Sequence, residues 1–429
     1  MERQIMIIGG GASGLAAALA AAEIAGGQHV TVLERLDRVG KKLLATGNGR
    51  CNITNRNAAP ERYQTAGPAR LAQMLENVPP DAVLDFFAGL GLLCDTQPDG
   101  RVYPYCYQAS MVLDVLRAAL ERAGVSLLCG QTVTGLRRTK AGLAVTTAEG
   151  KTFAAARVIL AAGGLAAPQF GTDGAGYTLA RAAGHTVRTP YPCLVPLRCA
   201  AFPAGRKGPH AAEAAFPSGL KGLRANAALT LLDAGRTPQT ELRTECGEIQ
   251  FAEYGLSGIP AMQLSCLLPQ AKKPEVAVDL LPQFAANEVR GMIEARCQSG
   301  NFPTLETLLL GLIGKKLGYA VMKACGLQPL SRTAKSLPAA GRDALAETLK
   351  HWRFAVTGTL PWAQAQATGG GVPLSEVDEA CASRKCPGLS LTGEVLDAVG
   401  ECGGFNLQWA WATGIAAGRA AGRAVTGET

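Results

Sequence analysis

The chain has 429 residues, more than one hydrophobic core usually organises, so we expect two or more compact units. Hydrophobic residues make up 48% and charged residues 18% of the sequence, which excludes a disordered or fibrous chain. Glycine is unusually frequent, with 52 residues or about 12% against a typical ~7%, and this indicates backbone packed close to a large neighbour. The net charge of 42 − 34 = +8 suits anionic small molecules or nucleic acid, but no basic run is concentrated enough to indicate nucleic acid.

The N-terminal stretch 4–22 carries no charge and ends in three alanines, so it imitates a signal peptide. Glycines at 9, 10, 11 and 14 interrupt the place where a signal peptide would be continuously apolar. The stretch divides better into a strand at 5–8 and an alanine-rich helix from about Ala12. We expect no membrane segment here, and no other stretch is apolar enough to span a bilayer.

The hydrophobic and glycine pattern of residues 5–33 predicts a βαβ unit. Its parts are a strand at 5–8, a glycine turn at 9–14, a helix at 16–25 and a strand at 30–33. A polar loop is expected at 40–57, because that segment lacks apolar periodicity. Further elements follow in chain order. Helices are predicted at 80–90, 110–123 and 174–183, and strands at 126–129, 133–139, 143–147 and 157–161.

Composition changes near residue 190, where prolines become frequent and nucleotide-like glycine turns become rare. We expect residues 1–190 and 356–429 to form one domain. Residues 191–355 are then an inserted domain that covers the substrate, β-rich at first and helical from about residue 285. A long uncharged helix is predicted at 406–417.

Thirteen cysteines are scattered along the chain without a Cys-x-x-Cys pair or a zinc-like spacing. In a chain of this length they are typical of reduced thiols in the cytoplasm, and no metal site is expected.

The turn after the first strand reads Gly9-x-Gly11-x-x-Gly14 and opens a helix. Gly9 permits the tight turn, Gly11 lets the backbone approach a pyrophosphate, and Gly14 allows the helix to pack on the strand. Glu34 stands at the end of the second strand, where a carboxylate accepts hydrogen bonds from ribose hydroxyls and repels a 2′-phosphate. The pattern therefore predicts FAD or NAD and disfavours NADP, against the alternative of an ordinary glycine-rich turn.

The stretch Thr46 to Asn55 places polar side chains between glycines, which indicates a segment that wraps a ribityl chain or ring system. A solvated surface loop is the alternative. Near the other end, Gly393-Glu394-Val395-Leu396-Asp397 precedes Gly404-Phe405-Asn406 and the final helix. An acidic residue there is suited to binding the ribityl–phosphate part of FAD, and the helix N-terminus is suited to an interaction with the flavin O2. The alternative is a turn before a buried helix.

These motifs, together with Gly174-x-Gly176-Tyr177, Gly255–Gly258 and Gly369–Gly371, extend over nearly the whole chain. On them the chain resembles a bacterial flavoprotein family that includes the bile-acid-inducible enone reductase and aminoacetone-oxidase-like proteins. The resemblance implies an α/β fold with a Rossmann-like FAD-binding domain of the glutathione-reductase type and an inserted domain over the flavin face. The residues we expect at FAD are Gly9, Gly11, Ala12, Ser13, Gly14, Glu34, Arg35, Lys42, Gly47, Asn48, Arg50, Cys51, Asn52, Val133, Ala162, Gly163, Gly164, Gly371, Gly393, Glu394, Asp397, Gly404, Phe405 and Asn406.

The resemblance also implies hydride transfer from NADH or NADPH through FAD to an enone or similar small molecule. No second glycine turn after a strand is present for a nicotinamide domain, so we expect the donor to bind transiently. Family members tend to have Phe-Thr-His where this sequence has Phe251-Ala252-Glu253, which leaves the substrate open.

Tyr254, Glu253 and Arg50 are the catalytic candidates, and Tyr103 and His351 are further candidates for the proton donor. Cys51 and Cys402 are expected near the flavin in packing or polar contacts. Three other functions remain open: an amine or aminoketone oxidase, a flavin-dependent RNA-modifying enzyme suggested by the charge, and a flavin sensor without turnover.

Overall fold

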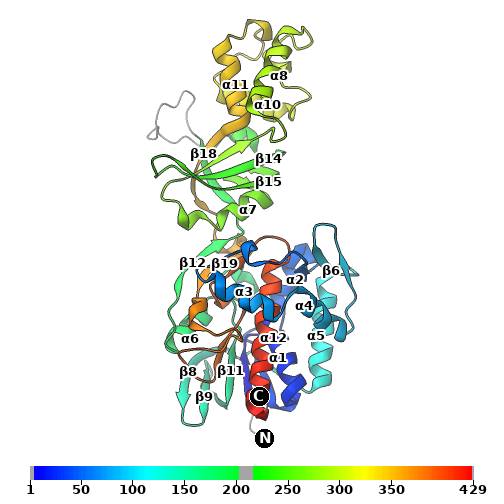
Figure 1. Ribbon diagram of the computed structural model, residues 1–429, viewed down its shortest axis with the longest axis vertical. Helices are drawn as coiled ribbons and strands as arrows, with labels where there is room; N and C mark the ends of the chain where they lie inside the picture. The colour runs from blue at the N-terminus through cyan, green and yellow to red at the C-terminus, as the bar shows by residue number, and fades with distance from the viewer. Residues whose placement is uncertain (1–3, 202–215, 428–429) are drawn as a thin grey trace. The chain divides into compact units, whose positions relative to one another are not determined.

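The computed structural model describes residues 4–201 and 216–427 (Figure 1). The chain forms two compact units, one made of Met1–Cys193 and Ala365–Thr429 and the other of Leu194–Gln364. The sequence placed these divisions at 190 and 355. The later one would cut strand β18 (Trp352–Thr359), which the structure keeps whole within the second unit.

The first unit is built on a five-stranded parallel sheet with strand order β20-β11-β1-β2-β7. Its strands are β1 (Ile5–Ile8), β2 (Val30–Leu33), β7 (Ser126–Leu128), β11 (Arg157–Leu160) and β20 (Leu389–Leu391). All residues of β1 and β2 are buried, as in parallel sheets that helices cover on both faces. The predicted βαβ unit is confirmed. Strand β20 follows the inserted unit in sequence, so both ends of the chain build one sheet.

Two helices from the two ends of the chain lie side by side: α1 (Ala12–Ala25) and α12 (Phe405–Thr426) (Figure 1). Their backbones approach closely where α12 carries glycine at every fourth position. A Cβ on Gly414 would collide with the carbonyl oxygen of Ser13, and one on Gly418 with that of Ala17. A Cβ on Gly422 would lie 2.9 Å from Cβ of Ile24, two turns further along α1. The helices are therefore parallel, and α12 is longer than the predicted 406–417.

The remaining helices of this unit are α2 (Lys41–Ala45), α3 (Pro68–Asn77), α4 (Pro80–Gly89), α5 (Ala109–Ala123) and α6 (Ala175–Ala182). The predicted helices at 80–90, 110–123 and 174–183 are confirmed within one residue at each end. The expectation that 40–57 is a loop throughout was wrong. That segment contains α2, a 3₁₀ turn at Thr46–Gly49 and strand β3 (Thr54–Asn55).

Smaller antiparallel sheets complete the unit. One contains β8 (Val133–Thr139), β9 (Gly142–Thr147) and β10 (Thr152–Ala155), of which sequence reasoning missed β10. In another, β6 (Arg101–Pro104) lies between β3 and β5 (Cys94–Thr96). The last two pair β4 (Tyr63–Gln64) with β21 (Val399–Gly400), and β12 (Arg188–Cys193) with β19 (Ala367–Gly371).

The second unit is a closed barrel with a helical part. The barrel strands are β13 (Leu197–Ala201), β14 (Arg224–Asp233), β15 (Thr240–Ala252), β16 (Gly255–Ser257), β17 (Pro274–Asp279) and β18. The helices are α7 (Ile259–Ser265), α8 (Ala286–Gln298), α9 (Leu305–Leu308), α10 (Lys315–Ala324) and α11 (Ala339–His351). Strand β18 returns to the barrel after α11, so helices α8 to α11 are an excursion between the barrel strands β17 and β18.

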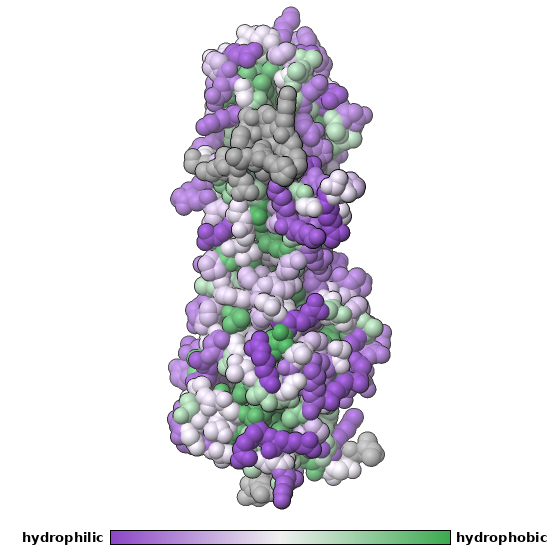
Figure 2. All heavy atoms as spheres, turned by 90° about the vertical axis from the view of Figure 1, so that its left-hand side faces the viewer, coloured by the Kyte–Doolittle hydropathy of each residue, from purple (hydrophilic) through white to green (hydrophobic). Residues whose placement is uncertain are grey.

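Hydrophilic residues cover most of the face seen in Figure 2, with hydrophobic residues showing between them. Within the described ranges, none of the helices combines the length and the apolar character needed to cross a bilayer. The N-terminal stretch that imitates a signal peptide forms β1 and α1 and is packed in the core.

Replacement of Gly418 by alanine should destabilise the first unit. The added methyl group would push α12 away from the Ala17 carbonyl, and we expect a loss of about 1–3 kcal/mol in the free energy of unfolding. Chemical denaturation measures it. Gly89→Ala is the matched control, because Gly89 lies in α4 with open space around its Cβ position, and it should cause no loss. Equal stability of the two variants would contradict close packing at Gly418.

Candidate functional site

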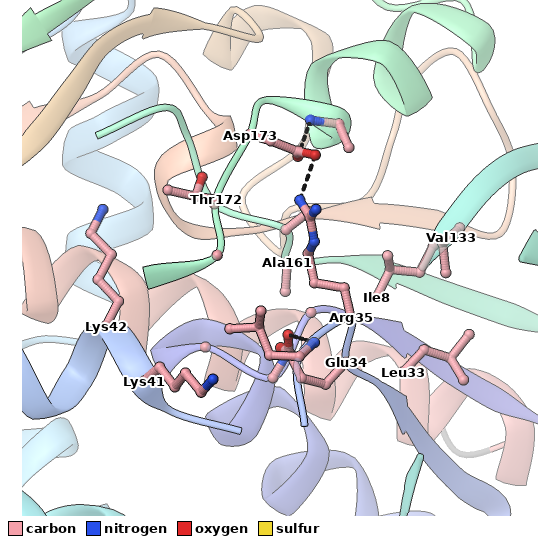
Figure 3. Close-up of a pocket in the computed structure, with 18 of the residues that line it drawn as sticks. Ile8, Leu33, Glu34, Arg35, Lys41, Lys42, Val133, Ala161, Thr172 and Asp173 are labelled. Carbon is pink, nitrogen blue, oxygen red and sulfur yellow. Dashed lines mark hydrogen bonds and ion pairs between the residues drawn. The ribbon is translucent and has the colours of Figure 1, made fainter. Parts of the chain in front are cut away.

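An open cavity of about 140 Å³ lies in the first unit at the carboxyl ends of β1 and β2 (Figure 3). The turn Gly9 to Gly11 forms one wall, and Val133, Ala162 and Gly163 contribute to the others. Ligands of open parallel sheets bind at this edge, beyond the carboxyl ends of the strands.

The three glycines of the Gly-x-Gly-x-x-Gly motif have different surroundings. Gly9 has φ +110°, and a Cβ there would collide with the carbonyl oxygen of Ala161. A Cβ on Gly14 would collide with the carbonyl oxygen of Gly9 itself. A Cβ on Gly11, in contrast, meets nothing within 4 Å. The fold therefore requires Gly9 and Gly14, whereas Gly11 faces open space at the start of α1, where no side chain caps the helix.

Glu34 is held at the floor of the cavity with 8% of its surface exposed. Its Oε2 accepts a hydrogen bond from the Gly10 N–H at 2.7 Å, and its Oε1 accepts one from the Leu36 N–H at 2.9 Å. These bonds fix the carboxylate at the end of β2. A negative charge at this position favours ribose hydroxyls and opposes a 2′-phosphate.

Two acceptor atoms in the cavity wall are buried and, among the described residues, have no hydrogen-bond partner: Oε1 of Gln131 and Oε1 of Glu394. The other oxygen of Glu394 forms an ion pair with Nζ of Lys42 at 2.8 Å. Buried polar atoms are normally paired, so these two oxygens are suited to hydroxyl or amino donors of a ligand. Free helix N–H groups, lysine and unpaired acceptors together fit FAD, with its pyrophosphate at α1 and its hydroxyls at the acidic residues.

A second group of predicted residues meets at the start of α12. Asn55 Nδ2 donates to the Gly403 carbonyl at 2.9 Å, and Thr54 Oγ1 donates to Gln408 Oε1 at 2.6 Å. A Cβ on Gly404 would lie 2.5 Å from the Thr54 carbonyl oxygen. The polar stretch 46–55 and the final helix, far apart in sequence, are thus one piece of structure.

Two side chains of this second group have different environments. Asn52 Oδ1 is buried and unpaired within the described part of the chain. Asn406 is engaged in its own turn, since its amide exchanges hydrogen bonds with the backbone of Gly400 at 2.8 and 2.9 Å. Asn52 is therefore the residue available to a ligand, whereas Asn406 holds the turn.

The acidic motif of the C-terminal region packs against the start of α1. Gly393 has φ +69°, and a Cβ there would lie 2.7 Å from Ser13 Oγ. Its N–H donates to Thr413 Oγ1 at 2.9 Å, and its carbonyl accepts from Trp409 Nε1 at 3.1 Å. Burial raises the pKa of Asp397, while Arg188, at 3.4 Å, acts in the opposite direction.

The structure therefore divides the predicted cofactor residues into two groups. Those that line the cavity are Gly9, Gly11, Glu34, Arg35, Lys42, Val133, Ala162, Gly163 and Glu394. Those outside its lining are Ala12, Ser13, Gly14, Gly47, Asn48, Arg50, Cys51, Asn52, Gly164, Gly371, Gly393, Asp397, Gly404, Phe405 and Asn406.

Sequence reasoning missed several lining residues, among them Gly10, Arg38, Lys41, Gln131, Phe170, Thr172 and Asp173. Gln131 comes just before strand β8, and Asp173 just before helix α6, so both stand at element ends. Polar residues at the ends of strands and helices are the signal that could have identified them.

Cys51 is fully buried with φ +56°, and burial raises its pKa to about 12. It is thus a neutral thiol at physiological pH, which fits packing and not redox chemistry. The neighbouring Arg50 lies over the Tyr103 ring, 5.2 Å from its centroid.

The other catalytic candidates belong to the second unit. Tyr254 and Glu253 form the turn between β15 and β16. Glu253 is exposed and ion-paired with Lys221 at 2.6 Å, whereas Tyr254 is half-buried. His351, at the end of α11, is exposed and contacts Glu347 at 3.1 Å.

The fold and the cavity define a dinucleotide-binding protein of the Rossmann class. The family described as "HI0933-like protein Rossmann domain" matches residues 3–420. A 3-dehydro-bile acid delta(4,6)-reductase of Clostridium scindens is 38% identical over 423 residues, which cover 97% of this chain and 98% of that protein. Ribosomal RNA dihydrouridine synthases of Haemophilus influenzae and Escherichia coli are each 26% identical over 421 residues, covering 96% of both chains.

The chain belongs to the HI0933-like family, and it is an FAD-binding oxidoreductase. The resemblance inferred from the motifs is thereby confirmed. The site residues themselves stay predictions.

Replacement of Gly11 by valine should remove FAD and leave the fold intact. The side chain has room in the protein but would fill the space above the start of α1, so we expect FAD affinity to fall more than about tenfold. Flavin absorbance of the purified protein and circular dichroism measure the two effects. Gly14→Val should instead lose the fold, because it collides with Gly9. A folded Gly11→Val variant with full flavin content would refute the assignment of the phosphates to this turn.

Proposed function

We propose that this protein reduces a C=C bond next to a carbonyl group in a small organic substrate, with electrons supplied by NADH or NADPH. The observation that carries the proposal is the 38% identity with a 3-dehydro-bile acid delta(4,6)-reductase along nearly the whole of both chains. The more distant relatives support the same chemistry. Dihydrouridine differs from uridine in a saturated ring bond beside a carbonyl, so both kinds of relative act on a conjugated C=C bond.

FAD, when bound, would supply the hydride transfer between the nicotinamide donor and the acceptor carbon. The residues of this chain bind the cofactor and orient it. The uncapped N-terminus of α1 and the open space at Gly11 would hold the pyrophosphate, and Glu34 the adenosine ribose. The N-terminus of the 22-residue helix α12, also without a side-chain cap, favours negative charge by about 0.3–2 kcal/mol.

A proton must reach the carbon beside the one that receives hydride. We propose Tyr254 as its donor, since it is better shielded from water than Glu253. Tyr103 is the alternative in the first unit, where it lies under Arg50 and beside the 46–55 stretch.

All the cysteines of the sequence lie in the described ranges, and none of them forms a disulfide. This supports the proposal that the protein works in the reducing cytoplasm.

Anaerobic mixing with NADH or NADPH should bleach the flavin, and a conjugated enone should then restore its colour. The reduced flavin of a reductase passes its electrons to the enone faster than to oxygen. Stopped-flow absorbance measures both rates of flavin reoxidation directly. The corresponding saturated ketone is the control acceptor and should have no effect. Peroxide formation in step with an amine substrate would establish the oxidase in place of the reductase.

A second candidate function is flavin-dependent reduction of RNA, which the match to two ribosomal RNA dihydrouridine synthases favours. In that case unmodified ribosomal RNA, and not a small enone, would reoxidise the flavin. RNA binding would also weaken steeply with salt.

Tyr254→Phe should slow reoxidation of the reduced flavin by the enone by about 10²–10⁴-fold, the usual range for a lost general acid. Reduction of the flavin by the nicotinamide donor should not change, because that half-reaction needs no acid at the acceptor. Tyr103→Phe is the matched comparison, measured in the same two half-reactions. Loss of the oxidative half-reaction in Tyr103→Phe alone would transfer the role to Tyr103.

A further inference from the structure

An ion pair crosses the rim of the cavity between Arg35 and Asp173 (Figure 3). Arg35 follows Glu34 at the end of β2, and Asp173 lies in the loop that leads into α6. Both residues line the same cavity although they come from parts of the chain that are far apart in sequence. The pair therefore joins two walls of the site that the backbone does not connect locally.

The loop that carries Asp173 is held in place from both sides. Asp173 Oδ1 accepts the Ala175 N–H at 3.0 Å at the start of α6. At the other end of the loop, Gly171 has φ +100°, and a Cβ there would collide with the Leu36 side chain. The loop thus rests on the residue next to Arg35, and the ion pair extends this contact over the cavity.

The pair adds little to the stability of the fold. The Arg35 and Asp173 side chains are 38% and 50% exposed, and exposed ion pairs contribute little to folding. Its position over an open cavity gives it a different effect. A molecule seated beside Glu34 would lie in the cavity that the pair borders.

We propose that Arg35 and Asp173 form a clasp that retains the adenosine half of FAD by slowing its release. This inference rests on FAD binding in the cavity and not on the identity of the substrate. Asp173 is a positioning residue here, because it acts on the cofactor through Arg35.

The test is the rate of FAD release from the holoenzyme after dilution, followed by the rise in fluorescence of free flavin. Asp173→Asn keeps the acceptor for the Ala175 N–H and removes the charge. It should release FAD about threefold to fivefold faster, as expected for loss of one exposed ion pair. Arg35→Gln should release it at least as fast, and the double variant no faster than Arg35→Gln alone. Added salt should speed release from the native protein and not from Asp173→Asn.

Asp37→Asn is the matched control. It removes the ion pair between Asp37 and Lys41, at 2.6 Å, of which only Lys41 is a lining residue of the cavity, and release should stay at the native rate. Release of FAD from Asp173→Asn at the native rate, or additive effects on that rate in the double variant, would refute the clasp. Those results would leave flavin reduction and enone turnover intact, whereas failure of the proposed function would leave the release rates unaffected.

Discussion

The close parallel packing of α1 and α12 is the constraint on which the site depends. Gly414 and Gly418 allow the two backbones to touch at Ser13 and Ala17, which no larger residue permits. Because the helices are parallel, both N-termini point toward the carboxyl edge of the sheet. Each carries a partial positive charge there, and parallel helix dipoles repel one another. A bound anion at that edge relieves the repulsion, so the packing of the helices and the binding of a pyrophosphate favour each other.

This arrangement explains why the cofactor residues come from so many parts of the chain. The first helix supplies the phosphate turn, and the last supplies a second uncapped N-terminus. Between them, the 46–55 stretch is fastened to α12 by Asn55 and Thr54, and Gly393 is fastened to it by Thr413 and Trp409. The second unit is inserted between strands β11 and β20, which are neighbours in the sheet, so the insertion does not interrupt the site.

The sequence was a good guide where local pattern and structure coincide. Strands β1 and β2, their glycine turn and Glu34 follow from periodicity and spacing alone. The end of α12 could not be predicted in this way. Gly418 in a sequence resembles a helix stop, whereas here it makes room for α1. Gln131 and Asp173 are polar residues at the ends of elements, which makes them candidates, but only the tertiary structure brings them to the cavity. The short strand β10 was missed because its alanines have no strand preference.

The close contact of the α12 glycines with α1 also affects how the protein folds during synthesis. Ribosomes synthesise α1 near the beginning and α12 only after the entire barrel and its helices have been translated. Throughout that interval the alanine-rich surface of α1 lacks its native neighbour and is open to other contacts. The first unit must therefore finish folding last, although its first strand and helix are among the earliest parts to leave the ribosome.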